Sequence, residues 1–255
     1  KIDEAIRLFS DRTDVQFGCH HWPMWGKERV VSFLKKQRDL YKFIHDQTLR
    51  LANKGFSKEE IAEQIKLPQS LSQEFFNRDY YGTVHHNSKA VFVRYLGYFD
   101  GNPSTLYERP PLERAIRYVE WMGGPAKILE KARESFDSGD YRWTAEVLNH
   151  VVMADEKHEE ARCLLADTLE QLGYQSESAT WRNFFLCGAL ELREGLPPTR
   201  DFVPSSGMAA GIPIDQVFKT MAVRLLPDQV DGEVIQVGID LTDDAPCMLS
   251  IENCV

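Results

Sequence analysis

Apolar residues recur at helical spacing through most of the first half of the chain. The helical period is clear over 2–9 and 27–52, and a capping box of Ser57 and Glu60 begins a further short helix. Between the first two helices, residues 14–19 alternate in polarity and are rich in β-forming side chains, which predicts a short strand. The pattern therefore predicts a mainly α-helical segment that contains one short strand.

The middle of the chain predicts a domain of paired helices. A proline begins and two glycines end a helix over 110–124, and four more helical patterns with short breaks follow over 126–194. Small residues fall where neighbouring helices would touch, as in tetratricopeptide hairpins: Ala145, Ala161 and Ala166. Because two such pairs are too few for a free-standing repeat array, we expect this region to dock on the rest of the chain or on a second copy.

The last quarter of the chain predicts a small α+β unit. Residues 195–207 concentrate Pro, Gly and Ser and indicate a linker, after which Pro213 begins one helix. The final segment, "EVIQVGIDLTDDAPCMLSIENCV", alternates in polarity on both sides of an acidic turn and predicts a β-hairpin. One helix and one hairpin make about half of a small α+β domain and would leave a sheet edge unpaired.

The composition indicates a sizeable core and an acidic surface, in one large domain or two smaller ones. Hydrophobic residues make up 43% of the 255 positions, and 30 basic against 39 acidic residues give a formal net charge of −9. Nucleic-acid surfaces draw their affinity from Lys and Arg, so this charge argues against nucleic acid as a partner. No stretch approaches the roughly 18 uninterrupted apolar residues of a membrane helix, so no membrane span is predicted.

The five cysteines are odd in number, widely spaced and free of CxxC pairs. This pattern favours reduced, mostly buried thiols over a disulfide framework or a cysteine-based zinc site. The residues are Cys19, Cys163, Cys187, Cys247 and Cys254.

Two adjacent histidines in "FGCHHWPMWG" are the first candidate site. Neighbouring side chains on a strand or turn point to opposite sides, so only one of His20 and His21 can face a given metal ion. Zinc needs three or four ligands, and no HxH, HxxxH or HExxH motif supplies them in this chain. The residues alone therefore favour an aromatic turn whose imidazoles bond to the backbone over a metal corner.

A second cluster combines several hydrogen-bond donors with one carboxylate, Asp79. Such a composition is expected around a bound oxyanion, where donors match phosphate or sulfate oxygens. The same residues fit equally well an aromatic core in which the polar ends of the side chains are hydrogen-bonded. The donors are Arg78, Tyr80, Tyr81, His85, His86 and Asn87.

Two other polar groups are predicted to be structural. His45 lies six residues from Asp39 and next to Asp46, and neither spacing favours an acid–base pair on a helix, so a satisfied structural histidine is expected. Arg182, within an apparent packing stretch that includes Trp181, is a candidate to pair with an acid across a helix pair.

Several long stretches, taken in order, closely resemble the alkyl sulfatase family, whose members carry a zinc-dependent metallo-β-lactamase-type catalytic domain. The resemblance runs almost continuously from residue 1 to about 195. It is carried by "HHWPMWG", "RDLYKFIHDQTLRLANKG", "RDYYGTVHHNSKAVFVRYLGYFDGNP", "RYVEWMGG", "GDYRWTAEVLNHVVMAD" and "ADTLEQLGYQSESATWRNFFL".

The resemblance implies a mainly α fold in three parts. Residues 1–110 would form the end of the metallo-β-lactamase-type (αβ/βα) catalytic domain with a helical extension. Residues 111–195 would form the α-helical, tetratricopeptide-like dimerisation domain of a homodimer. Residues 205–255 would form part of a sterol-carrier-protein-like α+β domain.

The resemblance also implies roles for individual residues. His20 would ligate one of two zinc ions, and His86 would donate a proton to the leaving alcohol or bind sulfate. Tyr81, Asn87 and Tyr95 are weaker candidates for contacts to the sulfate or its approach. Many similar sequences have Tyr where this chain has Phe92, which puts a hydroxyl contact at that position in doubt.

The family's HxHxDH motif and two later metal-binding glutamates are absent from this sequence, which begins at Lys1 rather than Met. We therefore expect a portion of an enzyme that, alone, binds zinc poorly and hydrolyses nothing. With the preceding segment supplied, the expected reaction is hydrolysis of an alkyl sulfate to alcohol and inorganic sulfate. The alternative is a non-catalytic helical module for dimerisation or lipid binding. The termini give no prediction of localisation.

Overall fold

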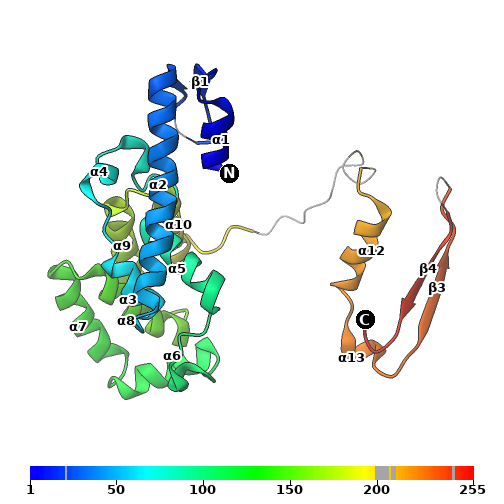
Figure 1. Cartoon of the computed structure of the whole chain (residues 1–255). Coiled ribbons are helices and arrows are strands. Elements are labelled where there is room, and N and C mark those ends of the chain that lie inside the picture. The colour runs from blue at the N-terminus through cyan, green and yellow to red at the C-terminus, as the bar shows by residue number, and fades with distance from the viewer. Residues whose placement is uncertain (21, 199–206, 208–210, 243–244) are drawn as a thin grey trace. The chain divides into compact units, whose positions relative to one another are not determined.

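The computed structural model describes residues 1–20, 22–198, 207, 211–242 and 245–255. The chain divides into two compact units, residues 1–197 and residues 198–255 (Figure 1). The predicted mainly α-helical character is confirmed.

Unit 1 is built from helices and one short two-stranded ribbon in its described residues. In chain order its elements are α1 (Ile2–Phe9), β1 (Val15–Gln16), β2 (Met24–Trp25), α2 (Lys27–Ala52), α3 (Lys58–Gln64), α4 (Gln69–Ser72), η1 (Phe75–Asn77), α5 (Val84–Leu96), η2 (Pro103–Thr105), α6 (Pro111–Trp121), α7 (Pro125–Asp137), α8 (Tyr141–Ala154), α9 (Glu159–Gln175) and α10 (Ala179–Glu194).

The 26-residue helix α2 is the central element of residues 1–96, since α1, the ribbon, α3, α4, η1 and α5 all pack against it. Figure 1 shows α1 and the ribbon beside one end of α2 and α3 beside the other. A small core forms where α2, α3 and α5 meet, and it contains Leu51, Ile61 and Phe92. Because Phe92 is only 5% exposed, a Tyr there would bring a hydroxyl into this core.

Helices α6 to α10 form a second packed body around one larger core. Pro111 starts α6 at its first helical position, and Gly123 and Gly124 follow the helix with positive φ values of 93° and 88°, as the sequence predicts. Helices α9 and α10 approach closely at Gly173, where an added Cβ would lie 2.9 Å from Leu186 Cδ2. The core consists of Ile128, Leu129, Ala132, Val147, Leu148, Val151, Ala161, Leu164 and Leu165. The tetratricopeptide likeness of this body stays a prediction.

The segment around the histidine pair differs from the predicted strand and turn. Only Val15 and Gln16 form β1, which pairs antiparallel with β2 inside the predicted turn, in the register Val15↔Trp25 and Gln16↔Met24. The ladder stops there because Pro23 has no N–H to donate to it. The ribbon is thus a short hairpin that carries His20 in its connecting loop.

The cysteine prediction is half right. All five thiols are free, as expected, but Cys19, Cys163 and Cys187 are exposed rather than buried. Cys163 and Cys187 fall on solvent-facing positions of α9 and α10, and Cys19 lies in the ribbon's loop, where no core packs against it.

Unit 2 contains α12 (Ile214–Ala222), α13 (Pro227–Val230), β3 (Ile235–Ile239) and β4 (Cys247–Ile251). The predicted hairpin is confirmed, since β3 and β4 pair antiparallel from Ile235↔Ile251 to Ile239↔Cys247. Most of the predicted linker, at 199–206, and part of the acidic turn, at 243–244, lie outside the described residues. Among the residues described, we find no helix with the length and apolar character needed to cross a membrane.

Candidate functional site

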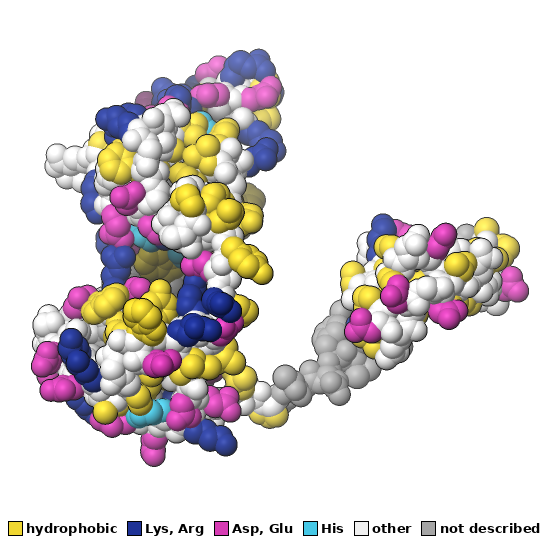
Figure 2. All heavy atoms as spheres, turned by 90° about the horizontal axis from the view of Figure 1, so that it is seen from below, with side chains coloured by type: hydrophobic (Ala, Val, Ile, Leu, Met, Phe, Trp, Pro, Cys, Tyr) yellow, Lys and Arg dark blue, Asp and Glu magenta, His cyan; other side chains and the backbone are white. Residues whose placement is uncertain are grey.

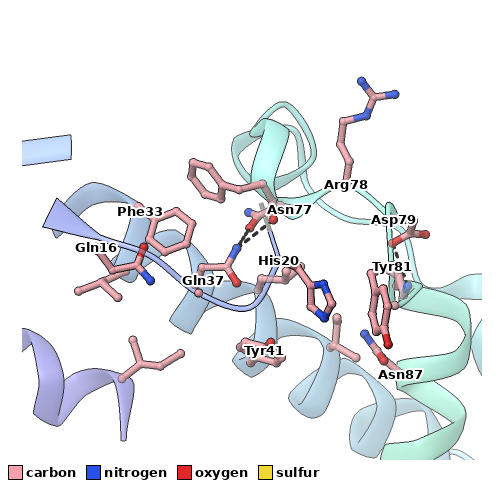
Figure 3. Close-up of a pocket in the computed structure, with 18 residues that line it drawn as sticks. Gln16, His20, Phe33, Gln37, Tyr41, Asn77, Arg78, Asp79, Tyr81 and Asn87 are labelled. Atoms are coloured by element: carbon pink, nitrogen blue, oxygen red, sulfur yellow. Dashed lines mark hydrogen bonds between the residues drawn. The ribbon is translucent and has the colours of Figure 1, made fainter. Parts of the chain in front are cut away.

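A cavity of about 440 Å³ lies in unit 1 between α2, the β1–β2 loop and the segment from η1 to the start of α5. Figure 3 shows His20 entering from the loop, with Tyr81 and Asn87 beside its ring. The cavity therefore brings together three of the five residues singled out in the sequence. Gln16, Phe33, Gln37, Tyr41, Asn77, Arg78 and Asp79 also line it.

The imidazole of His20 stacks on the ring of Tyr81, with the ring centroids 4.2 Å apart and the planes 22° from parallel. The ribbon holds the loop in place, because the Gly26 N–H donates to the Asp14 carbonyl at 2.7 Å. His20 is otherwise exposed, so its nitrogens are accessible to a metal ion or a ligand. His21 lies outside the described residues.

A zinc site needs more than this one imidazole. In the described part of the chain, no group of three or more His, Cys, Asp or Glu side chains is placed to hold a metal ion. His20 has the right chemistry for one ligand, since neutral imidazole is a common zinc ligand. The described residues do not form a complete zinc site, and any zinc at His20 would depend on ligands from elsewhere.

A hydrogen bond between two amides, those of the buried Asn77 and the half-buried Gln37, fixes one wall of the cavity. Asn77 is 3% exposed, and Gln37 Nε2 on α2 donates to its Oδ1 at 2.8 Å. Asn77 Nδ2 in turn donates to the Leu71 carbonyl at 3.1 Å. These bonds attach η1 to α2 and so set where the following loop begins.

The loop that carries Tyr81 is tied to the start of α10. The Ala179 N–H donates to the Tyr80 carbonyl at 2.9 Å. The hydroxyls of Ser178 and Thr180 both donate to the Tyr81 carbonyl, at 2.8 and 2.9 Å. The helical body of α6 to α10 therefore helps to position a wall of the cavity.

His86 is placed at the start of α5 and faces α10 rather than lining the cavity. Its backbone N–H donates to Thr83 Oγ1, the side-chain cap of α5, at 3.0 Å. Its ring nitrogen Nδ1 accepts a hydrogen bond from Trp181 Nε1 at 3.0 Å. The Trp181 contact was missed in the sequence, where this segment reads as packing.

The proposed oxyanion donors are partly engaged by carboxylates. Arg78 forms an ion pair with Glu177, and its guanidinium lies 5.3 Å from the centroid of the Tyr80 ring. Asp79 accepts from the Val84 N–H at 3.1 Å at the start of α5. Burial raises the pKa of Asp79, and the negative charge of Glu177 adds to this effect, although the Val84 bond opposes it.

His85 joins a charged network that bridges α3, α5 and α8. Its Nε2 lies 3.3 Å from Glu63 Oε1, which also accepts from the Arg142 guanidinium at 2.8 Å. The Arg142 bond is the main cause of a lowered pKa at Glu63, whereas burial lowers the pKa of His85. This network attaches the helical body to α3.

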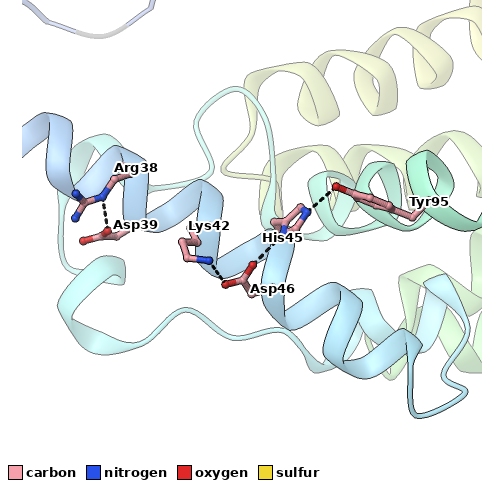
Figure 4. Close-up of polar contacts among 6 residues, drawn as sticks. All are labelled: Arg38, Asp39, Lys42, His45, Asp46 and Tyr95. Carbon is pink, nitrogen blue, oxygen red and sulfur yellow. Dashed lines mark hydrogen bonds and ion pairs between the residues drawn. The ribbon is translucent and has the colours of Figure 1, made fainter. Parts of the chain in front are cut away.

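His45 has a hydrogen-bond partner at each ring nitrogen, as expected of a satisfied histidine. One partner is Asp46, although the spacing of the two residues argued against such a pair (Figure 4). His45 Nδ1 lies 2.9 Å from Asp46 Oδ1, and its Nε2 lies 2.9 Å from the Tyr95 hydroxyl. Tyr95 comes from α5 and contacts His45, whereas Asp46 is held from its other side by Lys42 on α2. Hydrogen bonds from Lys42 and then His45 lower the pKa of Asp46. The structure thus places Tyr95 in this chain of contacts and outside the cavity lining.

Arg182 bonds to backbone carbonyls and not to the carboxylate that the sequence led us to expect. Its guanidinium donates to the backbone carbonyls of Ser176 and Glu177, at 2.9 and 3.1 Å. These carbonyls lie between the end of α9 and the start of α10, where helix ends leave acceptors unpaired. Arg182 therefore closes the turn between two helices instead of binding an acid.

Comparison with known proteins gives a consistent set of relatives. Residues 57–195 match the family described as alkyl sulfatase dimerisation. The chain is 49% identical over 244 residues, 95% of its length, to a linear primary-alkylsulfatase of a Pseudomonas species. It is 45% identical over 257 residues, 99% of its length, to an alkyl/aryl-sulfatase of Saccharomyces cerevisiae.

A solved structure agrees with these sequence relatives. The stereoselective inverting sec-alkylsulfatase Pisa1 of a Pseudomonas species matches 100% of this chain with a TM-score of 0.94 at 41% identity. The chain spans 36% and 39% of the length of the two sequence relatives and 40% of the solved chain.

Proposed function

Because the chain belongs to the alkyl sulfatase dimerisation family, we propose that it forms the C-terminal portion of a zinc-dependent alkyl sulfatase. In this proposal residues 1–110 complete a metallo-β-lactamase-type catalytic domain. Residues 111–195 form the dimerisation domain, and residues 205–255 belong to a sterol-carrier-protein-like domain. The names of the relatives, each an alkyl- or alkyl/aryl-sulfatase, support the substrate class.

The proposed reaction is hydrolysis of the ester, R–O–SO3⁻ + H2O → ROH + HSO4⁻. Two zinc ions, when bound, supply an acidified water as the nucleophile. His20 serves as one zinc ligand, and further ligands come from residues outside this chain. Tyr81 and Asn87 orient the sulfate group. His86 lies outside the cavity lining but directly before Asn87 on α5, and its proposed role is to donate a hydrogen bond or a proton on the leaving-group side. Tyr95, outside the cavity lining, is assigned only to the approach of the substrate.

The observation that carries the proposal is the meeting of His20 with Tyr81 and Asn87 in one cavity. A metal ligand beside hydroxyl and amide donors is the combination needed to polarise a sulfate ester and hold its oxygens. The cavity is open, which leaves room for the remaining ligands and for substrate.

Sulfate release tests the function. A longer protein that contains this chain and its preceding residues should release inorganic sulfate from dodecyl sulfate. A chelator should abolish the release and added zinc should restore it, with sulfate measured by ion chromatography. The 255-residue chain alone should release none, even with zinc. A zinc-loaded longer protein that dimerises without releasing sulfate would favour the non-catalytic module, and release by the chain alone would contradict the need for outside ligands.

We also propose that the dimerisation domain forms a homodimer through α6. Large apolar side chains stay exposed on this helix, with Leu112, Ile116 and Trp121 at 53%, 48% and 90% exposure. Figure 2 shows hydrophobic patches among interspersed acidic and basic side chains on one face of the molecule. Leu112 and Ile116 lie one turn apart and so form an exposed apolar pair on one face of α6, whereas Trp121 lies on another side of the helix. Exposed apolar side chains grouped on one face are typical of a subunit interface.

Sedimentation tests the dimer. At micromolar concentration the chain should sediment with about twice its 29.3 kDa mass. The double variant Leu112→Asp and Ile116→Asp should sediment as a monomer, because two carboxylates on the same face of α6 would be buried unpaired at the interface. The matched control is Phe184→Asp on α10, a residue that is also exposed, at 83%, and it should leave the dimer intact. A wild-type monomer, or a dimer disrupted only by the α10 change, would contradict the assignment to α6.

A further inference from the structure

The hydrogen bond between Trp181 and His86 defines which nitrogen of His86 carries the proton. The indole Nε1 is a donor only, so the Nδ1 that it contacts at 3.0 Å must be the acceptor. A neutral imidazole has one N–H, and with Nδ1 accepting, that proton resides on Nε2. The contact therefore selects one tautomer of a neutral side chain.

The backbone holds the two rings in this arrangement. His86 and Trp181 occupy the same position, the third residue of a helix, after the side-chain caps Thr83 of α5 and Ser178 of α10. The ring centroids lie 4.7 Å apart. Ser178 also donates to the Tyr81 carbonyl at 2.8 Å, so the two helix starts are linked through one residue.

His86 lies in the first turn of α5, with two further rings beside its own. A second imidazole, that of His85, lies 5.8 Å away between ring centroids and meets the Trp181 ring edge-on at 5.5 Å. Protonating Nδ1 would set two N–H groups against each other across the Trp181 contact.

We propose that Trp181 is a positioning residue that fixes His86 as the neutral Nε2–H imidazole, so that His86 donates a hydrogen bond to the sulfate ester instead of transferring a proton. Neutral imidazole is a good hydrogen-bond donor and a very weak acid, so it stabilises developing negative charge without giving up its proton. Its role toward the ester rests on the proposed function, whereas its tautomer does not. Of the two roles that the resemblance suggested for His86, proton donor or sulfate-binding group, the proposal keeps the second.

Nitrogen NMR of the 255-residue chain tests the tautomer directly. With histidine labelled at both ring nitrogens, His86 should show a protonated Nε2 and an unprotonated, hydrogen-bonded Nδ1 at neutral pH, with its signal identified by its loss in His86→Gln. Trp181→Phe keeps an aromatic ring but removes the donor, so the Nδ1 signal should shift and the Nδ1–H form should grow. Trp143→Phe is the matched control, because Trp143 is also the third residue of a capped helix, α8, and it should change nothing at His86.

Turnover by the longer protein supplies the second measurement. Loss of the Trp181 bond should lower kcat by about fivefold to tenfold with little change in KM, the effect of one neutral hydrogen bond. A protonated Nδ1 in the wild type, or an unchanged His86 spectrum in Trp181→Phe, would overturn the inference whether or not sulfate is released. An active longer protein with wild-type kcat in Trp181→Phe would overturn the positioning role. An inactive longer protein would count against the proposed function alone, since the spectra still report the tautomer.

Discussion

Replacing His20 by alanine in the longer, zinc-loaded protein should remove zinc and turnover together. The imidazole is the one side chain of this chain assigned as a zinc ligand, and an incomplete ligand set can neither hold the ion nor acidify its water. We expect bound zinc to fall by about one ion per subunit and kcat for dodecyl sulfate to fall on the order of 10³-fold or more. Elemental analysis of the dialysed protein and sulfate release measure the two effects.

A second variant separates ligation from packing. His20 stacks on Tyr81, so alanine also removes a ring contact that shapes the cavity. His20→Phe keeps the stacking and removes the ligand nitrogens, and it should lose zinc and activity as fully as the alanine variant. Normal zinc content and turnover in either variant would show that the metal is held elsewhere.

Removing the donor at His86 should give the second largest loss of activity. His86→Leu leaves no hydrogen-bond donor at position 86, while Tyr81 and Asn87 stay in place. Loss of one donor of this kind costs on the order of 10²–10³-fold in kcat. His86→Gln keeps an N–H near the former Nε2 and should recover about tenfold of that loss. Steady-state kinetics on the longer protein, with zinc content measured in parallel, give the comparison.

The two substitutions at His86 distinguish the mechanisms. If His86 transfers a proton, glutamine should be as poor as leucine, because an amide has no acidic proton to give. The control is His158→Asn at the start of α9, where asparagine preserves the side-chain cap that His158 provides. It should retain full activity, and a comparable loss there would point to general destabilisation rather than lost chemistry.

Much of the fold follows from local signals in the sequence. The Ser57–Glu60 capping box is present with both of its bonds, and α2 covers the full range predicted from its apolar period. The hairpin of unit 2 also follows from alternation of polarity alone. These elements were predictable because a cap, a helix face and a strand face each depend on residues a few positions apart.

The candidate site was predictable only in part, because its contacts join distant segments. The sequence placed His20, Tyr81 and Asn87 in a site through resemblance, and nothing in their spacing shows that one cavity holds all three. The contact of His86 with Trp181 spans 95 positions. A serine three residues before a tryptophan is a readable helix-cap signal, but it does not say which residue the tryptophan will meet.

The link between the Tyr81 loop and α10 also sets an order of events during synthesis. Tyr81 leaves the ribosome long before Ser178, which lies 97 positions later and holds its carbonyl. At translation rates of about 5–20 residues per second, Ser178 is synthesised roughly 5–20 seconds after Tyr81. During that time the Tyr81 carbonyl lacks its hydrogen bond from Ser178. The part of the cavity wall that carries Tyr81 can therefore be fixed only late in synthesis, after α10 has begun to emerge.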